Sequence, residues 1–198
     1  MKRLYFFTAI LMIFCVCNNA GRDETTTTDS LEMNDTSQMM NDTASMAMVN
    51  HAEAEILATK ADTTVNGKIT FDSGSNSEVN MKLDLTIPSR AGKSVAVHIH
   101  ESGDCGNAGD MSKGHWNPTN AQHGKWGSGS YHLGDIGNVK LDKDGKGVLA
   151  LTTDQWALGG SSDKNIIGKA IIVHSGVDDY KSQPSGDAGS RIGCGVIK

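Results

Sequence analysis

From residue 55 onward the chain alternates short apolar runs with turn residues, and this alternation restricts the fold to a small set. Runs rich in Val, Ile, Leu and Thr are separated by Gly, Asp, Asn and Ser. They span residues 55–61, 67–72, 78–86, 93–101, 138–142, 147–153, 166–174 and 191–197. No long segment repeats apolar residues every 3.6 positions, as a helix would. The pattern predicts an all-β domain over residues 55–198, with eight antiparallel strands in a Greek-key β-barrel or sandwich.

Two connections between these runs, residues 102–137 and 175–190, are much longer than a hairpin needs. Long loops in a compact domain usually carry function. We therefore expect two long functional loops that hold the chemistry of the domain.

The first 17 residues have the pattern of a signal peptide. Lys2 and Arg3 precede an apolar run that ends at Cys17, and the run is short for a membrane-spanning helix. Residues 1–17 are thus predicted to be a signal peptide of an exported protein. Cys17 followed by Asn18 is typical of a lipid-modified cysteine, which would tether the chain to a membrane; simple cleavage near Ala20 is the alternative.

Residues 18–54 are predicted to be a disordered linker. They are rich in Thr, Ser, Asp, Asn and Met, contain neither Pro nor an aromatic residue, and offer too little apolar surface to fold alone. Thioether and imidazole groups that suit Cu(I) occur here at Met33, Met39, Met40, Met46, Met48 and His51. The linker could therefore deliver copper to the domain, or it could be a solvated spacer.

The charge distribution argues against nucleic acid as a partner. The whole chain carries a formal net charge of -5, and residues 55–198 contain 15 basic and 16 acidic residues. A nearly neutral domain attracts a charged ligand only through local placement of its charges.

Histidines supply the strongest indication of chemistry. In the run from Val95 to His100, alternation directs Val95, Val97 and Ile99 to one face and both histidines to the other. Two imidazoles at i and i+2 on a strand can chelate copper or zinc. The same alternation places His174 outward, so it can join them if the two strands are neighbours. The first long loop adds the three imidazoles and one carboxylate that tetrahedral zinc accepts: His115, His123, His132 and Asp135.

Several segments together resemble the copper/zinc superoxide dismutase family, in its bacterial, exported form. They are HIHE at 98–101, GD at 103–104, GHWNP at 114–118, HLGDIGN at 132–138, IIGKA at 166–170, VH at 173–174 and GSRIGCGV at 189–196.

The resemblance implies a ligand set for each of two metals. It assigns copper to His98, His100, His115 and His174, and zinc to His115, His123, His132 and Asp135. His115 would bridge both ions as an imidazolate, and it would take up and deliver a proton during the conversion of superoxide to dioxygen and hydrogen peroxide.

The resemblance also implies three supporting roles. Arg191 would dock the superoxide anion beside copper. Asp178, rather than its neighbour Asp179, would hydrogen-bond His98 and His123. The family pairs the equivalents of Cys105 and Cys194 in a disulfide, which suits an exported chain.

The location and assembly expected for such a chain are periplasmic or at the outer surface, anchored by lipid, as a monomer or a homodimer. An alternative function is an extracytoplasmic copper-binding or copper-buffering protein whose Met-rich linker is the active part. A family member that keeps only zinc is disfavoured, because all four copper-ligand positions are histidine.

Overall fold

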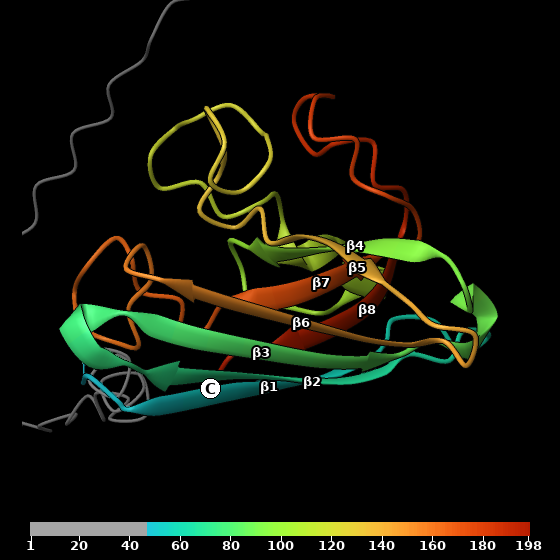
Figure 1. Ribbon diagram of the computed structural model, residues 1–198, viewed down its shortest axis with the longest axis horizontal. Helices are drawn as coiled ribbons and strands as arrows, with labels where there is room; N and C mark the ends of the chain where they lie inside the picture. The colour runs from blue at the N-terminus through green and yellow to red at the C-terminus, as the bar shows by residue number, and fades with distance from the viewer. Residues whose placement is uncertain (1–46) are drawn as a thin grey trace, which may run out of the picture. The chain divides into compact units, whose positions relative to one another are not determined.

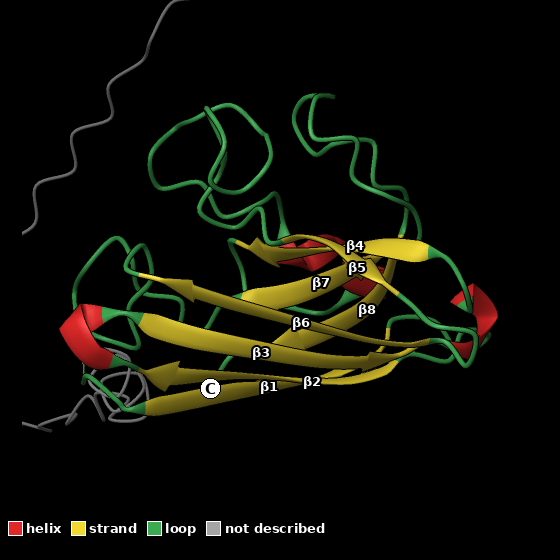
Figure 2. Cartoon of the chain, viewed as in Figure 1, coloured by secondary structure: helices red, strands yellow, loops and turns green. Residues whose placement is uncertain are grey.

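The computed structural model describes residues 47–198, and most of their regular secondary structure is β-strand (Figures 1 and 2). The strands are β1 (His51–Ala58), β2 (Asn66–Ser73), β3 (Val79–Thr86), β4 (Ser94–His100), β5 (Gly137–Lys140), β6 (Lys146–Thr153), β7 (Ala170–His174) and β8 (Arg191–Val196). Three short 3-10 segments accompany them: η1 (Ser75–Ser77), η2 (Pro88–Arg90) and η3 (Asn107–Ser112). No helix among residues 47–198 has the length and apolar character needed to span a membrane.

The eight strands of the described part form a single antiparallel sheet in the order β5-β4-β7-β8-β1-β2-β3-β6. The connections β3 to β4 and β6 to β7 join strands that are not neighbours in this order, which gives the crossovers of a Greek key. The sheet curls so that β5 and β6, its two ends, come close together, making a nearly closed barrel (Figure 1). The predicted fold class is confirmed.

Alternation along each strand builds the core. In β3, Val79, Met81, Leu83 and Leu85 are buried, and the residues between them are exposed. Val97 and Ile99 of β4 join the same apolar interior. A strand presents successive side chains to opposite faces, so the inward face of each strand can be apolar while the outward face carries polar residues or metal ligands.

Two strands begin four residues away from the start of their predicted runs, whereas the other six begin within one residue of it. β1 begins at His51, within the predicted linker, because Ala52 and Ala54 are small enough to be fully buried and continue the ladder with β2. The last four residues assigned to the linker are therefore part of the sheet. β7 begins at Ala170 rather than at residue 166, because Gly168 adopts a positive φ in a turn. The signal peptide, Cys17 and residues 18–46 of the linker lie outside the described residues.

The two long loops rise from the barrel on the same side (Figure 2). One runs from Glu101 to Ile136 and the other from Ser175 to Ser190. The first follows β4 and the second follows β7, and both strands carry histidines on their outward faces. The fold thus gathers the predicted functional segments at one place.

Candidate metal centre

Neighbouring strands bring three histidines together. β4 pairs with β7 so that His98 lies opposite Ile172 and His100 opposite Ala170. His174 ends β7, at a bulge in its pairing with β8. The ring centroids of His98 and His174 are 4.9 Å apart. All three rings are buried, because the long loops cover the outer face of the strands.

A fourth histidine reaches this cluster from the first long loop. His115 forms an isolated antiparallel bridge with His100, and the backbone N–H of Trp116 donates to the Ile99 carbonyl at 2.8 Å. The loop thereby continues the ladder beside β4. The centroids of the His98 and His115 rings are only 4.0 Å apart.

Two groups of potential metal ligands share His115. In each group the ligand atoms lie within 4.8 Å of one another. The first group is His98, His100, His115 and His174; the second group is His115, His123, His132 and Asp135. The structure thus brings together both residue sets that the sequence analysis singled out.

One ring nitrogen of each histidine in the first group has an anchoring partner. Nδ1 of His100 donates to the Lys113 carbonyl at 2.8 Å, and Nδ1 of His174 donates to the Gly189 carbonyl at 3.2 Å. His98 uses Nε2 toward Asp178, and His115 uses Nδ1 toward Asp135. Such contacts set the tautomer and leave the opposite nitrogen as the one that can bind a metal.

The opposite nitrogens are buried and lack partners. Within residues 47–198, the buried side-chain atoms without a hydrogen bond are Nδ1 of His98, Nε2 of His100, Nε2 of His115, Nδ1 of His123 and Nε2 of His174. Leaving a buried polar atom unsatisfied is costly, so such groups call for a partner. Four of the five belong to the first group. This donor set fits a copper ion, which imidazole suits.

The second group surrounds one carboxylate. Oδ1 of Asp135 lies 2.8 Å from Nδ1 of His115 and 3.1 Å from Nδ1 of His132. Nδ1 of His123 lies 3.0 Å from Oδ2, at an angle that makes no hydrogen bond. The backbone N–H groups of Gly124 and His132 hold Oδ2 at 3.1 and 2.8 Å. Three Nδ1 atoms and a carboxylate are a donor set that fits zinc.

Burial keeps the rings of His100, His115 and His174 neutral. It lowers the pKa of His100 to about 2 and that of His174 to about 3, and positive charge on neighbouring rings would lower both pKa values further. Burial also lowers the pKa of His115 to about 4, against the opposing effect of Asp135. Metal ligation requires unprotonated imidazole, so these rings are ready to bind at neutral pH.

In the second group, the ring of His123 favours positive charge. Burial lowers the pKa of His123, but the carboxylates of Asp135 and Asp178 outweigh burial and raise it to about 9. Burial raises the pKa of Asp135, but its histidine contacts outweigh burial and hold that pKa far below its ordinary value. A divalent cation at this position would therefore replace a proton.

Asp178 connects the two groups. Its Oδ2 lies 2.9 Å from Nε2 of His98, and its Oδ1 lies 2.9 Å from Nε2 of His123. The carboxylate is buried, and its backbone N–H donates to the side chain of Asn138. Asp179 instead caps the exposed turn at Ser182. The structure thus places Asp178, and not Asp179, against the two rings that the family resemblance implies.

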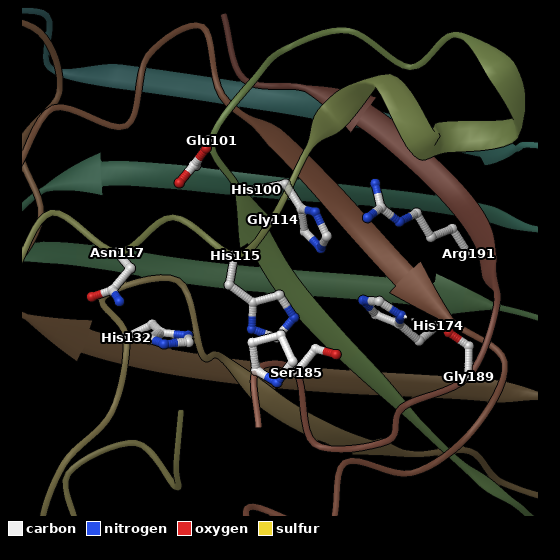
Figure 3. A pocket seen from close by; sticks show the side chains of 11 residues that line it. His100, Glu101, Gly114, His115, Asn117, His132, His174, Ser185, Gly189 and Arg191 are labelled. Carbon is white, nitrogen blue, oxygen red and sulfur yellow. Dashed lines mark hydrogen bonds between the residues drawn. The ribbon is translucent and has the colours of Figure 1, made fainter. Parts of the chain in front are cut away.

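A pocket of about 390 Å³ opens over the first group, between the two long loops (Figure 3). His100, His115 and His174 line it together with Arg191 and Ser185. Arg191 begins β8 directly opposite His174. A small anion entering the pocket therefore meets a guanidinium beside the unpartnered imidazole nitrogens.

The disulfide joins Cys105 to Cys194, as the resemblance implies. It links the first long loop to β8, three residues beyond Arg191. The loop that supplies His115 is thereby fastened to the strand that supplies the guanidinium.

Sequence reasoning missed residues that shape the site without being ligands themselves. Gly186 has φ of +70°, and a Cβ there would collide with Asp178 and with Nε2 of His123. The amide of Gln183 accepts from the backbone N–H of His123 at 2.9 Å and donates to its carbonyl at 3.0 Å. Ser112 is buried between Arg191 and His100. No periodicity or motif marks these positions, because their partners are backbone groups or distant side chains.

The family model described as copper/zinc superoxide dismutase (SODC) matches residues 65–197. The chain belongs to this family. It is 38% identical over 153 residues to superoxide dismutase [Cu-Zn] 2 of Aquifex aeolicus, covering 74% of this chain and 86% of the relative. It is 32% identical over 146 residues to the extracellular superoxide dismutase [Cu-Zn] of Caenorhabditis elegans, covering 71% and 64%.

Two solved structures share the fold of this chain. The clock protein EA4 superposes with a TM-score of 0.66 at 31% identity, covering 77% of this chain and 96% of that protein. A double mutant of a SOD-like protein from Bacillus subtilis superposes with a TM-score of 0.65 at 30% identity, covering 76% and 97%.

Proposed function

We propose that the first group holds copper and the second group holds zinc in a superoxide dismutase, with His115 shared between the two ions. The observation that carries the assignment is the set of buried ring nitrogens without partners, which converge from β4, β7 and the first long loop. The reaction converts two superoxide anions and two protons to dioxygen and hydrogen peroxide. Bound copper supplies a one-electron couple, and zinc, which has none, supplies fixed positive charge.

Arg191 binds the substrate anion in this proposal. Nη2 donates one hydrogen to the Lys113 carbonyl at 2.7 Å and has a second hydrogen for an anion in the pocket. Burial lowers the pKa of the guanidinium, yet an arginine keeps its charge at any physiological pH.

His115 acts as the proton donor. The ring lines the pocket, its Nε2 has no hydrogen-bond partner, and its Nδ1 lies beside Asp135. A proton carried on Nε2 can be donated to a reduced oxygen species held at Arg191. Asp135 holds the ring in place while that proton is transferred.

A truncation separates the enzyme from a copper buffer. The full chain and a chain lacking residues 18–46 are loaded with copper and zinc, and their copper content and superoxide turnover are measured. The cut stops short of β1, so the sheet is intact. We expect turnover per bound copper to be unchanged. A loss of most bound copper on truncation would favour the buffering function, and fully loaded protein without turnover would contradict the dismutase.

We also propose that the chain is exported to the periplasm or outer surface and anchored there by lipid on Cys17. The disulfide agrees with an oxidising compartment, and one relative is named extracellular. The expected result is a mature protein that begins at Cys17 and carries the added mass of acyl chains. Mass spectrometry that finds an unmodified terminus near Ala20 would overturn the anchor.

A further inference from the structure

We propose that Ser112 is a positioning residue that fixes the guanidinium of Arg191 relative to the ring of His100. The inference rests on the proposed function, because it concerns the anion position of the same site. Ser112 is the last residue of η3 in the disulfide-linked loop, and it is fully buried.

The hydroxyl of Ser112 has three partners inside the protein. It donates to the Gly109 carbonyl at 2.8 Å. It accepts from Nη1 of Arg191 at 2.8 Å, and it lies 3.2 Å from Nδ1 of His100. The single hydrogen on Nδ1 of His100 is donated mainly to the Lys113 carbonyl at 2.8 Å, so the Ser112 oxygen receives only the longer branch of that shared hydrogen bond. The Ser112 oxygen is thus a direct acceptor for Arg191 and a close neighbour of the His100 ring.

The backbone carbonyl of Lys113 also contacts both His100 and Arg191. The Lys113 carbonyl accepts from Nδ1 of His100 at 2.8 Å and from Nη2 of Arg191 at 2.7 Å. The guanidinium plane is therefore held at two adjacent points, a hydroxyl and a carbonyl. Each of those points also touches His100. The fork geometry of arginine suits such two-point fixation.

These contacts fix the direction of the Arg191 N–H group that is left to bind an anion. Nη1 gives its hydrogens to Gly109 and Ser112, so Nη1 is fixed to the loop. With Nη1 fixed, the free hydrogen on Nη2 has one direction relative to the unpartnered Nε2 of His100. Removing the Ser112 hydroxyl leaves the guanidinium held by the backbone carbonyls of Gly109, Asp110 and Lys113 alone, so its plane is fixed less tightly beside His100. The position of a bound anion then spreads, and its affinity falls.

Azide binding to protein loaded with copper and zinc tests this without relying on turnover. Azide is a stable small anion, and its binding is followed by visible absorption. We expect Ser112→Ala to weaken azide binding about three- to tenfold, the usual effect of one hydrogen bond, at unchanged copper content. Ser102→Ala is the matched control, because Ser102 lies in the same loop and its hydroxyl contacts the Asp104 backbone instead. Azide affinity of the control should stay at the wild-type value.

A double-mutant cycle separates positioning from a general structural effect. Arg191→Ala should weaken azide binding by roughly 10- to 100-fold, as for a charged hydrogen bond. Adding Ser112→Ala to that variant should then change azide affinity less than about twofold, since the residue it positions is gone. Ser112→Thr keeps the hydroxyl and should restore most of the affinity. If Ser112→Ala does not fold, Ser112→Gly removes the same hydroxyl with less volume.

Two results would overturn the positioning role. One is wild-type azide affinity in Ser112→Ala, and the other is an equal loss with and without Arg191. Neither depends on whether superoxide is the substrate. Conversely, the fully loaded wild type could bind azide and yet not consume superoxide. That result would contradict the proposed function, but the double-mutant cycle would still test the role of Ser112.

Discussion

Replacing His115 with alanine is expected to lower superoxide turnover by at least about 100-fold, the contribution of a positioned proton donor alone. Its two ring nitrogens serve different groups: Nδ1 lies 2.8 Å from Asp135, and Nε2 is buried among the first group without a partner. The substitution therefore removes a ligand from both proposed ions. The visible copper spectrum should change as well.

Controls for this variant use a histidine outside the cluster. His51→Ala removes an exposed ring on β1 that contacts Asp72 and Glu53. Its turnover and spectrum should match the wild type at equal metal content. An unchanged copper spectrum in fully loaded His115→Ala would count against a shared ligand.

Among the substitutions proposed here, removal of the disulfide is expected to lower the free energy of unfolding most. The bond spans 89 residues, and a loop of this length contributes about 4 to 5 kcal/mol in the chain-entropy model. The double variant Cys105→Ala with Cys194→Ala should therefore unfold roughly 10 to 20 °C lower. Thermal unfolding of metal-loaded protein, with and without a reductant, measures the shift.

The same bond supports the anion position. It fastens the loop that carries Gly109 and Ser112 to the strand that begins at Arg191. We expect azide affinity to fall together with stability in the double variant. A reductant should lower the unfolding temperature of the wild type and have no effect on the double variant; equal responses would show that another process is being measured.

Strands and histidines were predictable because they follow rules of local alternation. The run from Val95 to His100 needs only the two-residue period of a strand to separate core from site. The neighbourhood of β4 and β7, on which the meeting of His98 and His174 depends, is a property of the sheet order. Sequence reasoning stated it as a condition, and the pairing fulfils it.

Other features were out of reach for identifiable reasons. β1 begins four residues before its apolar run because alanines fill the core there, and alanine is a weak strand signal. Ser112 and Gln183 act through contacts with residues about 60 to 80 positions away along the chain. Gly186 matters for the space it leaves empty. Only the folded chain shows these relations.

β4 has an apolar face in the core and a histidine face under the loops, and this difference affects the register in which β4 can pair. Val97 faces Val173 across the ladder, and His98 faces Ile172. A shift of β4 by one residue in the register would bury its imidazoles in the apolar core and turn its valines toward the loops. Both changes raise the free energy of the misregistered sheet. His98 and His100 of β4 thus disfavour the wrong strand register during folding, besides being candidate metal ligands.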